Sequence, residues 1–187
     1  RYHPGHVWRI LGSLGWSLQR PARRARERDE AAIQQWVRQR WPVVNKTPGG
    51  EKLGVLQLMG RAYMPTLDCP FQVAKREVAK LKHETLAVLV DMHAEATSEK
   101  MAMGHFLDGD VSAVVGTHTH VQTADEQILP KGTAYLTDIG MTGPLHGVIG
   151  VKKELAIEKF LTGMPKRFEV ASGPTVFCAV LVEVDAQ

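Results

Sequence analysis

Most of the chain alternates short apolar segments with amphipathic ones, and this order restricts the fold more than any other feature. Residues 86–90 are five consecutive apolar residues, and residues 111–115 are apolar except for Ser112. Runs of this length are typical of strands buried on both faces. Residues 70–81 place apolar side chains at helical spacing, and residues 98–107 are expected to form another helix. The order of these segments predicts a layered α/β domain.

The same patterns predict the remaining elements of this region. Thr97 or Ser98 is a suitable N-cap for the helix at 98–107, because a hydroxyl group can accept a hydrogen bond from a free N–H group of the first turn. One more helix is expected at residues 152–161. Further strands are expected at residues 53–59, 134–137, 168–171 and 176–184.

The charge of the chain is divided unevenly along its length. Residues 1–46 carry ten basic and three acidic residues, a net charge of +7, whereas residues 47–187 carry thirteen basic and seventeen acidic residues, a net charge of −4. Helices are predicted at 4–15 and 29–41, and residues 45–50 are rich in turn formers. The sequence therefore predicts two pieces of different origin, a basic helical segment and an α/β domain.

Composition excludes several classes of protein. The sequence contains no run of about 18 apolar residues, so we expect neither a membrane-spanning helix nor a membrane partner. The basic amino terminus lacks the apolar stretch of a secretory signal, and a chain that begins with Arg1 is expected to be a fragment or a trimmed form. Cys69 and Cys178 follow no metal-binding or redox spacing, so we expect reduced thiols and a cytoplasmic protein.

Three histidines follow the two predicted buried strands. His93 comes after the first, and His118 and His120 come after the second. The carboxyl ends of strands in layered α/β folds are where ligands bind, and a His-x-His pair in extended backbone directs both imidazoles to one side. Gly116 is expected to allow a tight turn before the pair. The pattern favours a metal site, although polar histidines near a core remain an alternative reading.

Three neighbouring side chains can orient these imidazoles. Asp91, Thr117 and Thr119 flank the histidines and can accept or donate hydrogen bonds at the ring nitrogen that does not bind the metal. We therefore expect them to form the second layer of the site.

Several long strings in this region resemble one known family. Residues 90–100, 114–125 and 137–143 resemble signatures of the YmdB-type calcineurin-like metallophosphoesterases, and shorter matches lie at residues 58–61 and 160–163. The resemblance implies a layered α/β sandwich with a centre of two iron or manganese ions. It implies hydrolysis of phosphodiesters, with cyclic nucleotides such as 2′,3′-cyclic AMP as the substrate class.

The resemblance also assigns the ligands. It implies that His93 and His118 bind one metal and His120 the other. Acidic residues near the histidines could supply an oxygen ligand, although the resemblance favours second-layer or structural roles for them; these residues are Asp91, Glu95, Asp125 and Asp138.

Part of the family's ligand set has no counterpart in this sequence. The family also uses an Asp at the end of its first strand, a bridging acidic residue followed by Asn, and an Asn-His pair, whereas Asn45 is the only asparagine here. We therefore leave open whether the chain binds two metals, one or none, and whether it is catalytic. Strands that lack their neighbours present free edges, so a homo-oligomer is expected.

The first 44 residues resemble the winged helix-turn-helix of bacterial insertion-sequence transposases. The resemblance rests on residues 1–11, 14–17, 19–21, 23–30 and 36–42. It implies DNA binding, with which the positive charge agrees. The candidate DNA-binding residues are Arg9, Arg20, Arg23, Arg24 and Arg26. A basic helical pair without a binding role, or a fusion product without function, are the alternatives.

Overall fold

The computed structural model describes residues 45–46, 50–65 and 67–185. The chain divides into two compact units, Arg1–Pro42 and Val43–Gln187, and every described residue lies in the second. The predicted helices at 4–15 and 29–41, the five candidate DNA-binding arginines and part of the predicted boundary at 45–50 lie outside the described residues.

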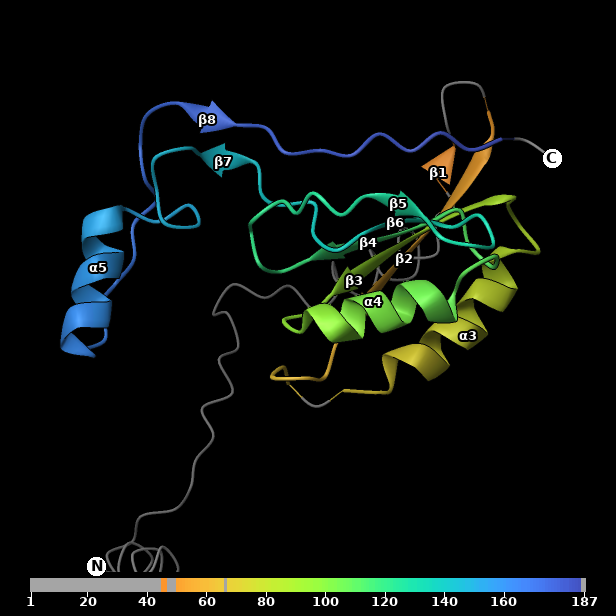
Figure 1. The fold of residues 1–187 in the computed structure, drawn as a ribbon, viewed down its shortest axis with the longest axis horizontal. Coiled ribbons are helices and arrows are strands. Elements are labelled where there is room, and N and C mark those ends of the chain that lie inside the picture. Colours follow the sequence, from red (N-terminus) through yellow and green to blue (C-terminus); the bar gives the residue numbers. More distant parts are fainter. Residues whose placement is uncertain (1–44, 47–49, 66, 186–187) are drawn as a thin grey trace, which may run out of the picture. The chain divides into compact units, whose positions relative to one another are not determined.

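A six-stranded sheet forms the centre of the second unit. Its strands follow the order β1-β2-β3-β4-β6-β5, in which β2, β3, β4 and β6 are parallel and the two edge strands are antiparallel (Figure 1). The strands are β1 (Asn45–Lys46), β2 (Lys52–Met59), β3 (Ala87–His93), β4 (Ala113–Thr117), β5 (Gln127–Ile128) and β6 (Ala134–Leu136). This arrangement confirms the predicted mixed α/β fold.

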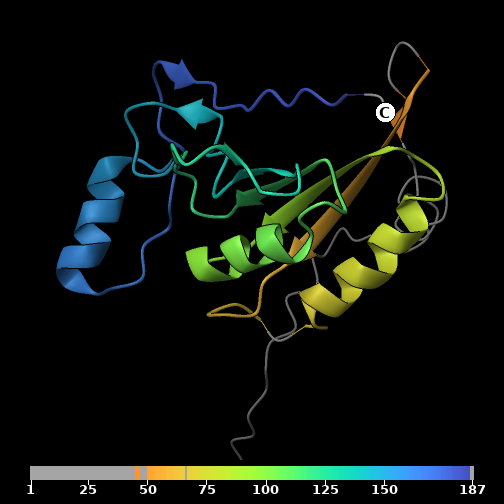
Figure 2. The same cartoon turned by 45° about the vertical axis from the view of Figure 1, so that its right-hand side comes forward.

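Two helices cover one face of this sheet. They are α3 (Pro70–Leu81) and α4 (Thr97–Phe106), and both views show them on the same side (Figures 1 and 2). Every second side chain of β3 points into the core that they form, so that Val88, Val90 and Met92 are at most 1% exposed. Burial of each such side chain contributes about 1.5–3 kcal/mol.

The bounds of the two helices agree with the prediction, whereas the predicted N-cap of α4 does not. Helix α3 spans the predicted residues, and α4 begins and ends one residue before its predicted bounds. The predicted cap is wrong, because Ala96 occupies the N-cap position and no side chain caps the helix. Thr97, the first helical residue, stands one position too late for that role.

Strand β3 differs from the prediction in its end and in its burial. It continues through His93, so Asp91 and His93 belong to the strand and not to the loop after it. Leu86 lies before the strand and is 83% exposed, and Leu89 is only half-buried. The prediction of burial on both faces is therefore wrong for this strand, because the described residues cover only the face under the helices. The same prediction is confirmed for β4.

The last part of the chain contains less regular structure than predicted. It holds β7 (Gly143–Pro144), α5 (Lys153–Thr162) and β8 (Thr175–Val176). The predicted strand at 168–171 is reduced to a single bridge between Val151 and Val170, and the strand predicted at 176–184 ends at Val176. A strand requires a neighbour along its whole length. Glu169 and Ala171 have backbone hydrogen bonds only to Lys152 and Gly150, and residues 177–184 have none with other described residues.

Two expectations from composition can be compared with the structure. Cys69 and Cys178 are not joined in a disulfide, and both are half-buried. Among the residues that the structure describes, no helix is long and apolar enough to cross a membrane.

Gly116 lies inside β4, so the turn predicted at this residue is wrong. A Cβ atom at this position would lie 1.7 Å from the carbonyl oxygen of Thr137 and 2.7 Å from Cδ of Lys100. The glycine therefore permits close approach between β4 and the residues that follow β6.

Gly116→Ala is expected to lower the free energy of unfolding by more than about 3 kcal/mol, because the added methyl group meets backbone that cannot move aside. Gly54→Ala in β2 serves as the control, because its added Cβ would meet Cγ2 of Thr85 at 3.0 Å, a side-chain atom. This control is expected to cost about 1 kcal/mol. Urea denaturation of both variants measures the difference, and equal losses would contradict the assignment.

Candidate functional site

His93 and His118 meet at the carboxyl ends of β3 and β4. His93 is the last residue of β3, and His118 directly follows β4. Parallel pairing aligns His93 with Thr117, which brings the two histidines side by side. Nε2 of His93 lies 3.1 Å from Nδ1 of His118, and the rings meet edge to face with centroids 4.8 Å apart. The predicted proximity of these two imidazoles is therefore present.

A chain of hydrogen bonds fixes the orientation of His93. The hydroxyl of Thr117 donates to the Asp91 carboxylate at 2.7 Å, and its oxygen lies 3.0 Å from Nδ1 of His93. With the hydroxyl proton directed to Asp91, we assign the ring proton to Nδ1, which leaves a lone pair on Nε2. Burial raises the pKa of Asp91, and the hydrogen bond from Thr117 only partly offsets this effect.

The carboxylate of Glu95 orients the ring of His118. Its carboxylate lies 2.9 Å from Nε2 of His118, so we assign the ring proton of a neutral imidazole to that nitrogen. Nδ1 of His118 then presents a lone pair to Nε2 of His93. Two lone pairs that face each other at this distance repel unless a cation lies between them.

A divalent metal ion fits this pair of donors. Imidazole nitrogens bind such ions at about 2.0–2.1 Å, so two ligands of a tetrahedral site stand about 3.3 Å apart. The observed separation of 3.1 Å is close to that value. The outer nitrogens are held by oxygen atoms, the usual arrangement around metal-binding histidines.

His120 lies apart from this pair. Residues 118 and 120 have φ angles of +108° and +66°, so the predicted extended His-x-His geometry is wrong and strand alternation does not apply to it. Nδ1 of His120 is 3.4 Å from the carbonyl oxygen of Ile149, and the side chain is exposed. Within the described ranges, no three His, Cys, Asp or Glu residues gather closely enough to hold a metal ion. The three-histidine ligand set therefore stays a prediction.

A buried ion pair supports the loop that carries His118 and His120. Nζ of Lys100 lies 2.7 Å from the Asp138 carboxylate, and both side chains are 1% exposed. The same carboxylate accepts hydrogen bonds from the N–H groups of Thr119 and Gly140. Burial acts to raise the pKa of Asp138, but these partners, Lys100 first, outweigh it and hold the pKa below its usual value. Asp138 thus connects helix α4 to the histidine loop.

Sequence reasoning did not identify Lys100 as part of this network. Lysine is usually exposed, and a lysine in a short helix gives no sign that it is buried. The sequence feature that indicated close packing here is Gly116, since a glycine in a buried strand marks a place where another group approaches closely. Here those groups are the carbonyl oxygen of Thr137 and the aliphatic chain of Lys100.

Two other predicted residues contact the surrounding loops and not an imidazole. The hydroxyl of Thr119 donates to the carbonyl oxygen of Val121 at 3.3 Å. Asp125 accepts hydrogen bonds from the N–H and hydroxyl groups of Thr137. Both residues therefore stabilise the loops that surround the site.

Arg61 lies at the same edge of the sheet. The sequence indicated this residue only as part of the match at residues 58–61. The N–H of Gly60 donates to the carbonyl oxygen of His93 at 2.9 Å. Glu99 of α4 accepts hydrogen bonds from the N–H groups of Arg61 and Ala62 at 3.0–3.2 Å. This loop therefore holds the backbone of Arg61 beside the strand that ends in His93, and the guanidinium group donates to Sγ of Cys69 at 3.4 Å.

Lys100→Met is expected to lower the free energy of unfolding by about 3–5 kcal/mol, because it leaves the Asp138 carboxylate buried without its cation. Lys80→Met, which removes an exposed lysine from α3, is expected to change it by less than about 1 kcal/mol. Guanidinium denaturation measures both. A Lys100→Met, Asp138→Asn double variant should recover part of the loss, and a single variant as stable as the parent would contradict a structural role for the pair.

Comparison with known proteins finds a matching family for each of the two parts of the sequence. Residues 35–187 match the model of a family described as YmdB-like protein, and residues 1–40 match that of the winged helix-turn helix. Both resemblances that the sequence suggested are thereby confirmed. Residues 1–40 lie outside the part of the chain that the structure describes.

A curated relative and two solved structures resemble the larger part. The 2′,3′-cyclic-nucleotide 2′-phosphodiesterase of Bacillus subtilis (strain 168) is 52% identical over 138 residues, which are 74% of this chain and 52% of that protein. A crystal structure of a hypothetical protein from Thermus thermophilus matches with a TM-score of 0.63 and 51% identity, over 69% of this chain and 50% of that one. A crystal structure of a novel phosphatase from Mycoplasma pneumoniae matches with a TM-score of 0.59 and 44% identity, over 64% and 43% of the two chains.

The chain thus spans about half the length, or less, of the curated relatives that it matches. The match to the family model nevertheless covers most of the present sequence, including the strands that carry His93 and His118. On this ground the chain belongs to the YmdB-like protein family.

Proposed function

We propose that this chain carries one part of a metal-dependent phosphodiesterase site, in which His93 and His118 bind one divalent ion and His120 binds a second. The observation that carries the proposal is the pair of facing ring nitrogens, 3.1 Å apart, with Thr117 and Glu95 engaged on the opposite nitrogens. Family membership supports the same assignment.

The proposed substrate is a phosphodiester, with cyclic nucleotides such as 2′,3′-cyclic AMP as the class. The name of the Bacillus subtilis relative supports this choice. When bound, iron or manganese ions would polarise the phosphoryl group and supply a hydroxide for in-line attack. The exposed guanidinium of Arg61 is suited to bind a phosphate oxygen at the same edge of the sheet.

The residues of this chain have distinct roles in the proposal. Thr117 and Asp91 keep the proton of His93 on Nδ1, and Glu95 keeps that of His118 on Nε2. Lys100 and Asp138 hold the loop that contains His118 and His120 in place. A two-metal centre also needs a carboxylate that bridges its ions, and hydrolysis therefore requires oxygen ligands in addition to the imidazoles.

The purified chain is expected to bind at least one divalent ion with His93 and His118 as ligands. Titration calorimetry with Mn²⁺, beside metal content by plasma mass spectrometry, measures binding in the parent and in His93→Ala, His118→Ala and His120→Ala variants. Thr117→Val is expected to weaken binding by about 10–100-fold, because it releases the ring of His93 from its hydrogen bond.

His83→Ala is the matched control, because His83 is exposed and precedes β3 at its opposite end. Its metal content should equal that of the parent. A folded parent that binds no divalent ion would sink the phosphodiesterase proposal, and binding that survives loss of both His93 and His118 would show that other residues hold the ion.

A second candidate function is DNA binding by residues 1–46. The winged helix-turn-helix match over residues 1–40 and the net charge of +7 favour it. The candidate phosphate contacts are Arg9, Arg20, Arg23, Arg24 and Arg26.

Duplex DNA binding by this segment is expected to weaken steeply with salt. Replacing Arg23, Arg24 and Arg26 by Ala should reduce the slope of log K against log salt by about 0.9 for each phosphate that the variant no longer neutralises. Fluorescence anisotropy at several salt concentrations measures the slope. The control replaces three exposed cations of α3, Lys75, Arg76 and Lys80, and equal effects of the two sets would contradict a binding role for the arginines.

A further inference from the structure

Two adjacent residues of α4 hold the loops on both sides of His93. Lys100 supports the loop after β4 through its buried ion pair. Glu99 reaches the loop after β2, where its carboxylate accepts hydrogen bonds from the N–H groups of Arg61 and Ala62. Strand β3 lies between β2 and β4 in the sheet. The start of α4 therefore braces the strand that ends in His93 from both sides.

Both carboxylate oxygens of Glu99 take part in its contact with the β2 loop. The nitrogen of Arg61 lies 3.0 Å from Oε1 and 3.1 Å from Oε2, and the nitrogen of Ala62 lies 3.2 Å from Oε2. Hydrogen bonds to an ionised acceptor are stronger than those between neutral groups. Within the described residues, neither N–H group has a backbone acceptor. Glu99 therefore fixes the backbone of these two residues.

The glycine before Arg61 connects the same loop to the candidate site. The N–H of Gly60 donates to the carbonyl oxygen of His93 at 2.9 Å. A Cβ atom at position 60 would collide with the carboxylate of Glu99 and would lie 2.6 Å from Cβ of Ala94. A glycine at this position therefore permits the carboxylate and the end of β3 to approach the loop closely.

The side chain of Arg61 is held less firmly than its backbone. It is exposed, and its guanidinium group donates to Sγ of Cys69 at 3.4 Å. Sulfur is a weak acceptor, whereas the guanidinium fork matches two oxygens of a phosphate group. A phosphate can therefore draw the guanidinium group away from the thiol while Glu99 keeps the backbone of Arg61 in place.

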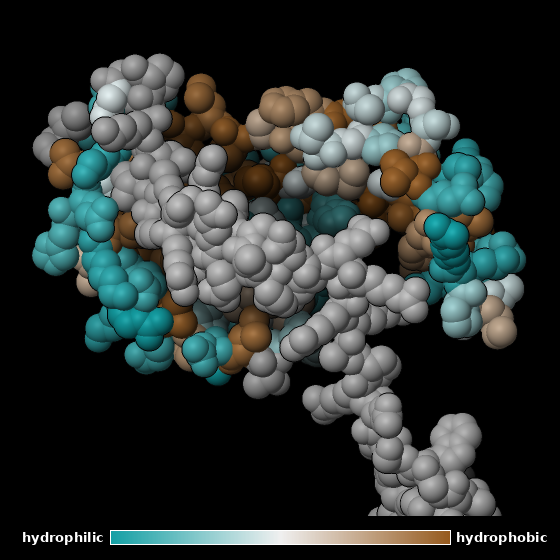
Figure 3. Space-filling model, turned by 180° about the vertical axis from the view of Figure 1, so that it is seen from behind, coloured by the Kyte–Doolittle hydropathy of each residue, from teal (hydrophilic) through white to brown (hydrophobic). Residues whose placement is uncertain are grey.

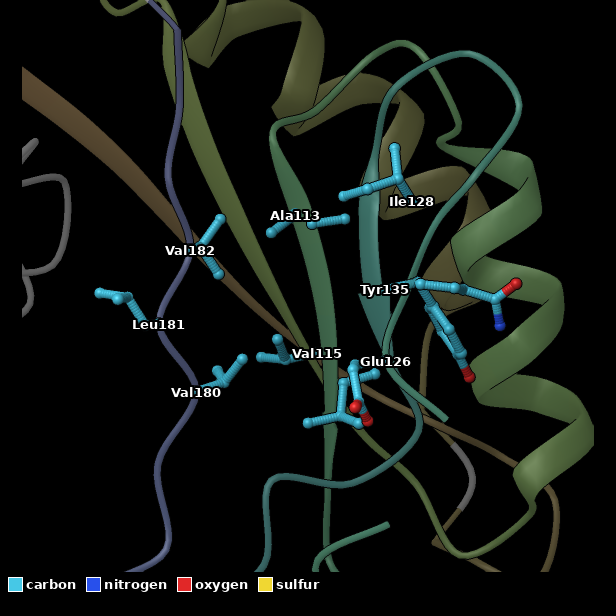
Figure 4. Close-up of a pocket in the computed structure, with 11 residues that line it drawn as sticks. Ala113, Val115, Glu126, Ile128, Tyr135, Val180, Leu181 and Val182 are labelled. Carbon is cyan, nitrogen blue, oxygen red and sulfur yellow. The ribbon is translucent and has the colours of Figure 1, made fainter. Parts of the chain in front are cut away.

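The opposite side of the sheet provides a place for control substitutions. Apolar residues are visible on that side (Figure 3). A cavity of about 290 Å³ lies between Val180 and Val182 of the chain after β8 and Ala113 and Val115 of β4 (Figure 4). Glu99 does not line this cavity. A substitution there changes packing without touching the contacts of α4 with the β2 loop.

We propose that Glu99 is a positioning residue, which holds Arg61 at the edge of the sheet so that its guanidinium group binds a phosphate oxygen of the substrate. The choice of a phosphodiester as substrate rests on the proposed function. The action of Glu99 rests on its contacts with the β2 loop. Glu99 acts through the backbone of Arg61 and Ala62, and it does not touch the phosphate itself.

A purely structural role of Glu99 gives a different result. An acidic residue in the first turn stabilises a helix, because its charge lies near the free N–H groups of that turn. Loss of this role alone would speed amide exchange throughout α4 and leave the β2 loop unchanged. The amides of Arg61 and Ala62 therefore distinguish the two roles.

The first experiment measures hydrogen exchange of the full chain by NMR. Glu99→Ala is expected to speed exchange at the amides of Arg61 and Ala62 by about tenfold or more, because both lose a charged acceptor. Exchange at Thr119 and Gly140, whose amides donate to Asp138, should stay within about twofold. Glu99→Gln keeps one carbonyl oxygen and should restore protection at one of the two loop amides.

Two variants serve as controls for this experiment. Glu77→Gln in α3 removes a helical carboxylate that accepts hydrogen bonds from the side chains of Arg76 and Lys80. Val180→Ala enlarges the cavity on the opposite side of the sheet and controls for general loss of stability. Neither is expected to speed exchange at Arg61 and Ala62 relative to the other amides.

The second experiment measures binding of inorganic phosphate to the full chain by calorimetry in buffer with Mn²⁺. Glu99→Ala is expected to weaken phosphate binding by about tenfold, because Arg61 is no longer held at the site. It should change Mn²⁺ affinity by about twofold or less. Arg61→Met should also weaken phosphate binding, and Glu99→Ala added to Arg61→Met should weaken it no further, because both act through the same group.

Three results would overturn the inference. The first is unchanged exchange at Arg61 and Ala62 in Glu99→Ala. The second is faster exchange throughout α4 with no change in the loop. The third is a further loss of phosphate affinity when Glu99→Ala is added to Arg61→Met, which would show that the carboxylate acts by another route.

Failure of the proposed function gives a separate result. A chain that binds phosphate with the expected pattern and takes up no Mn²⁺ would reject the metal-dependent phosphodiesterase and keep the role of Glu99. A chain that binds Mn²⁺ through His93 and His118 but binds no phosphate would do the reverse.

Discussion

The ion pair between Lys100 and Asp138 connects the parts of the chain on which the candidate site depends. It lies at the interface of α4, β4 and the residues after β6, with both side chains 1% exposed. Burial of two charges is costly, and the cost is offset only when each charge has further partners. Asp138 has them in the N–H groups of Thr119 and Gly140. The pair therefore fixes the loop that contains His118 and His120, and Gly116 leaves room beside it for the Thr137 carbonyl and the lysine side chain.

Parallel pairing of β3 and β4 positions the two imidazoles relative to each other. Register between β3 and β4 brings His93 beside Thr117, and the chain direction then carries His118 across to meet the first imidazole. Oxygen atoms hold the outer nitrogen of each ring, which leaves one lone pair on each directed at the other. The described residues thus bring two imidazoles together, and no group of three His, Cys, Asp or Glu side chains gathers among them to hold a metal ion.

The described residues pack differently on the two faces of the central sheet. Helices bury one face of the sheet, while the other carries half-exposed apolar residues, a cavity and a segment without strand partners among the described residues. Strand β2, which pairs with the strand that ends in His93, carries the half-exposed apolar side chains Val55 and Met59.

The sequence by itself determined the order of strands and helices, the extent of α3, the position of the histidines at strand ends and the membership of the family, because these depend on local periodicity and on long consecutive motifs. It predicted too many strands at 168–171 and 176–184, since apolar composition does not reveal whether a neighbour exists. It also misjudged the geometry of His118 and His120, because a positive φ angle arises from the constraints of the surrounding loop and not from residue type. Only the tertiary structure decided the contact between His93 and His118, the burial of Lys100 and the exposure of Val55. Each of these depends on contacts between residues far apart in the chain, and local sequence patterns do not encode them.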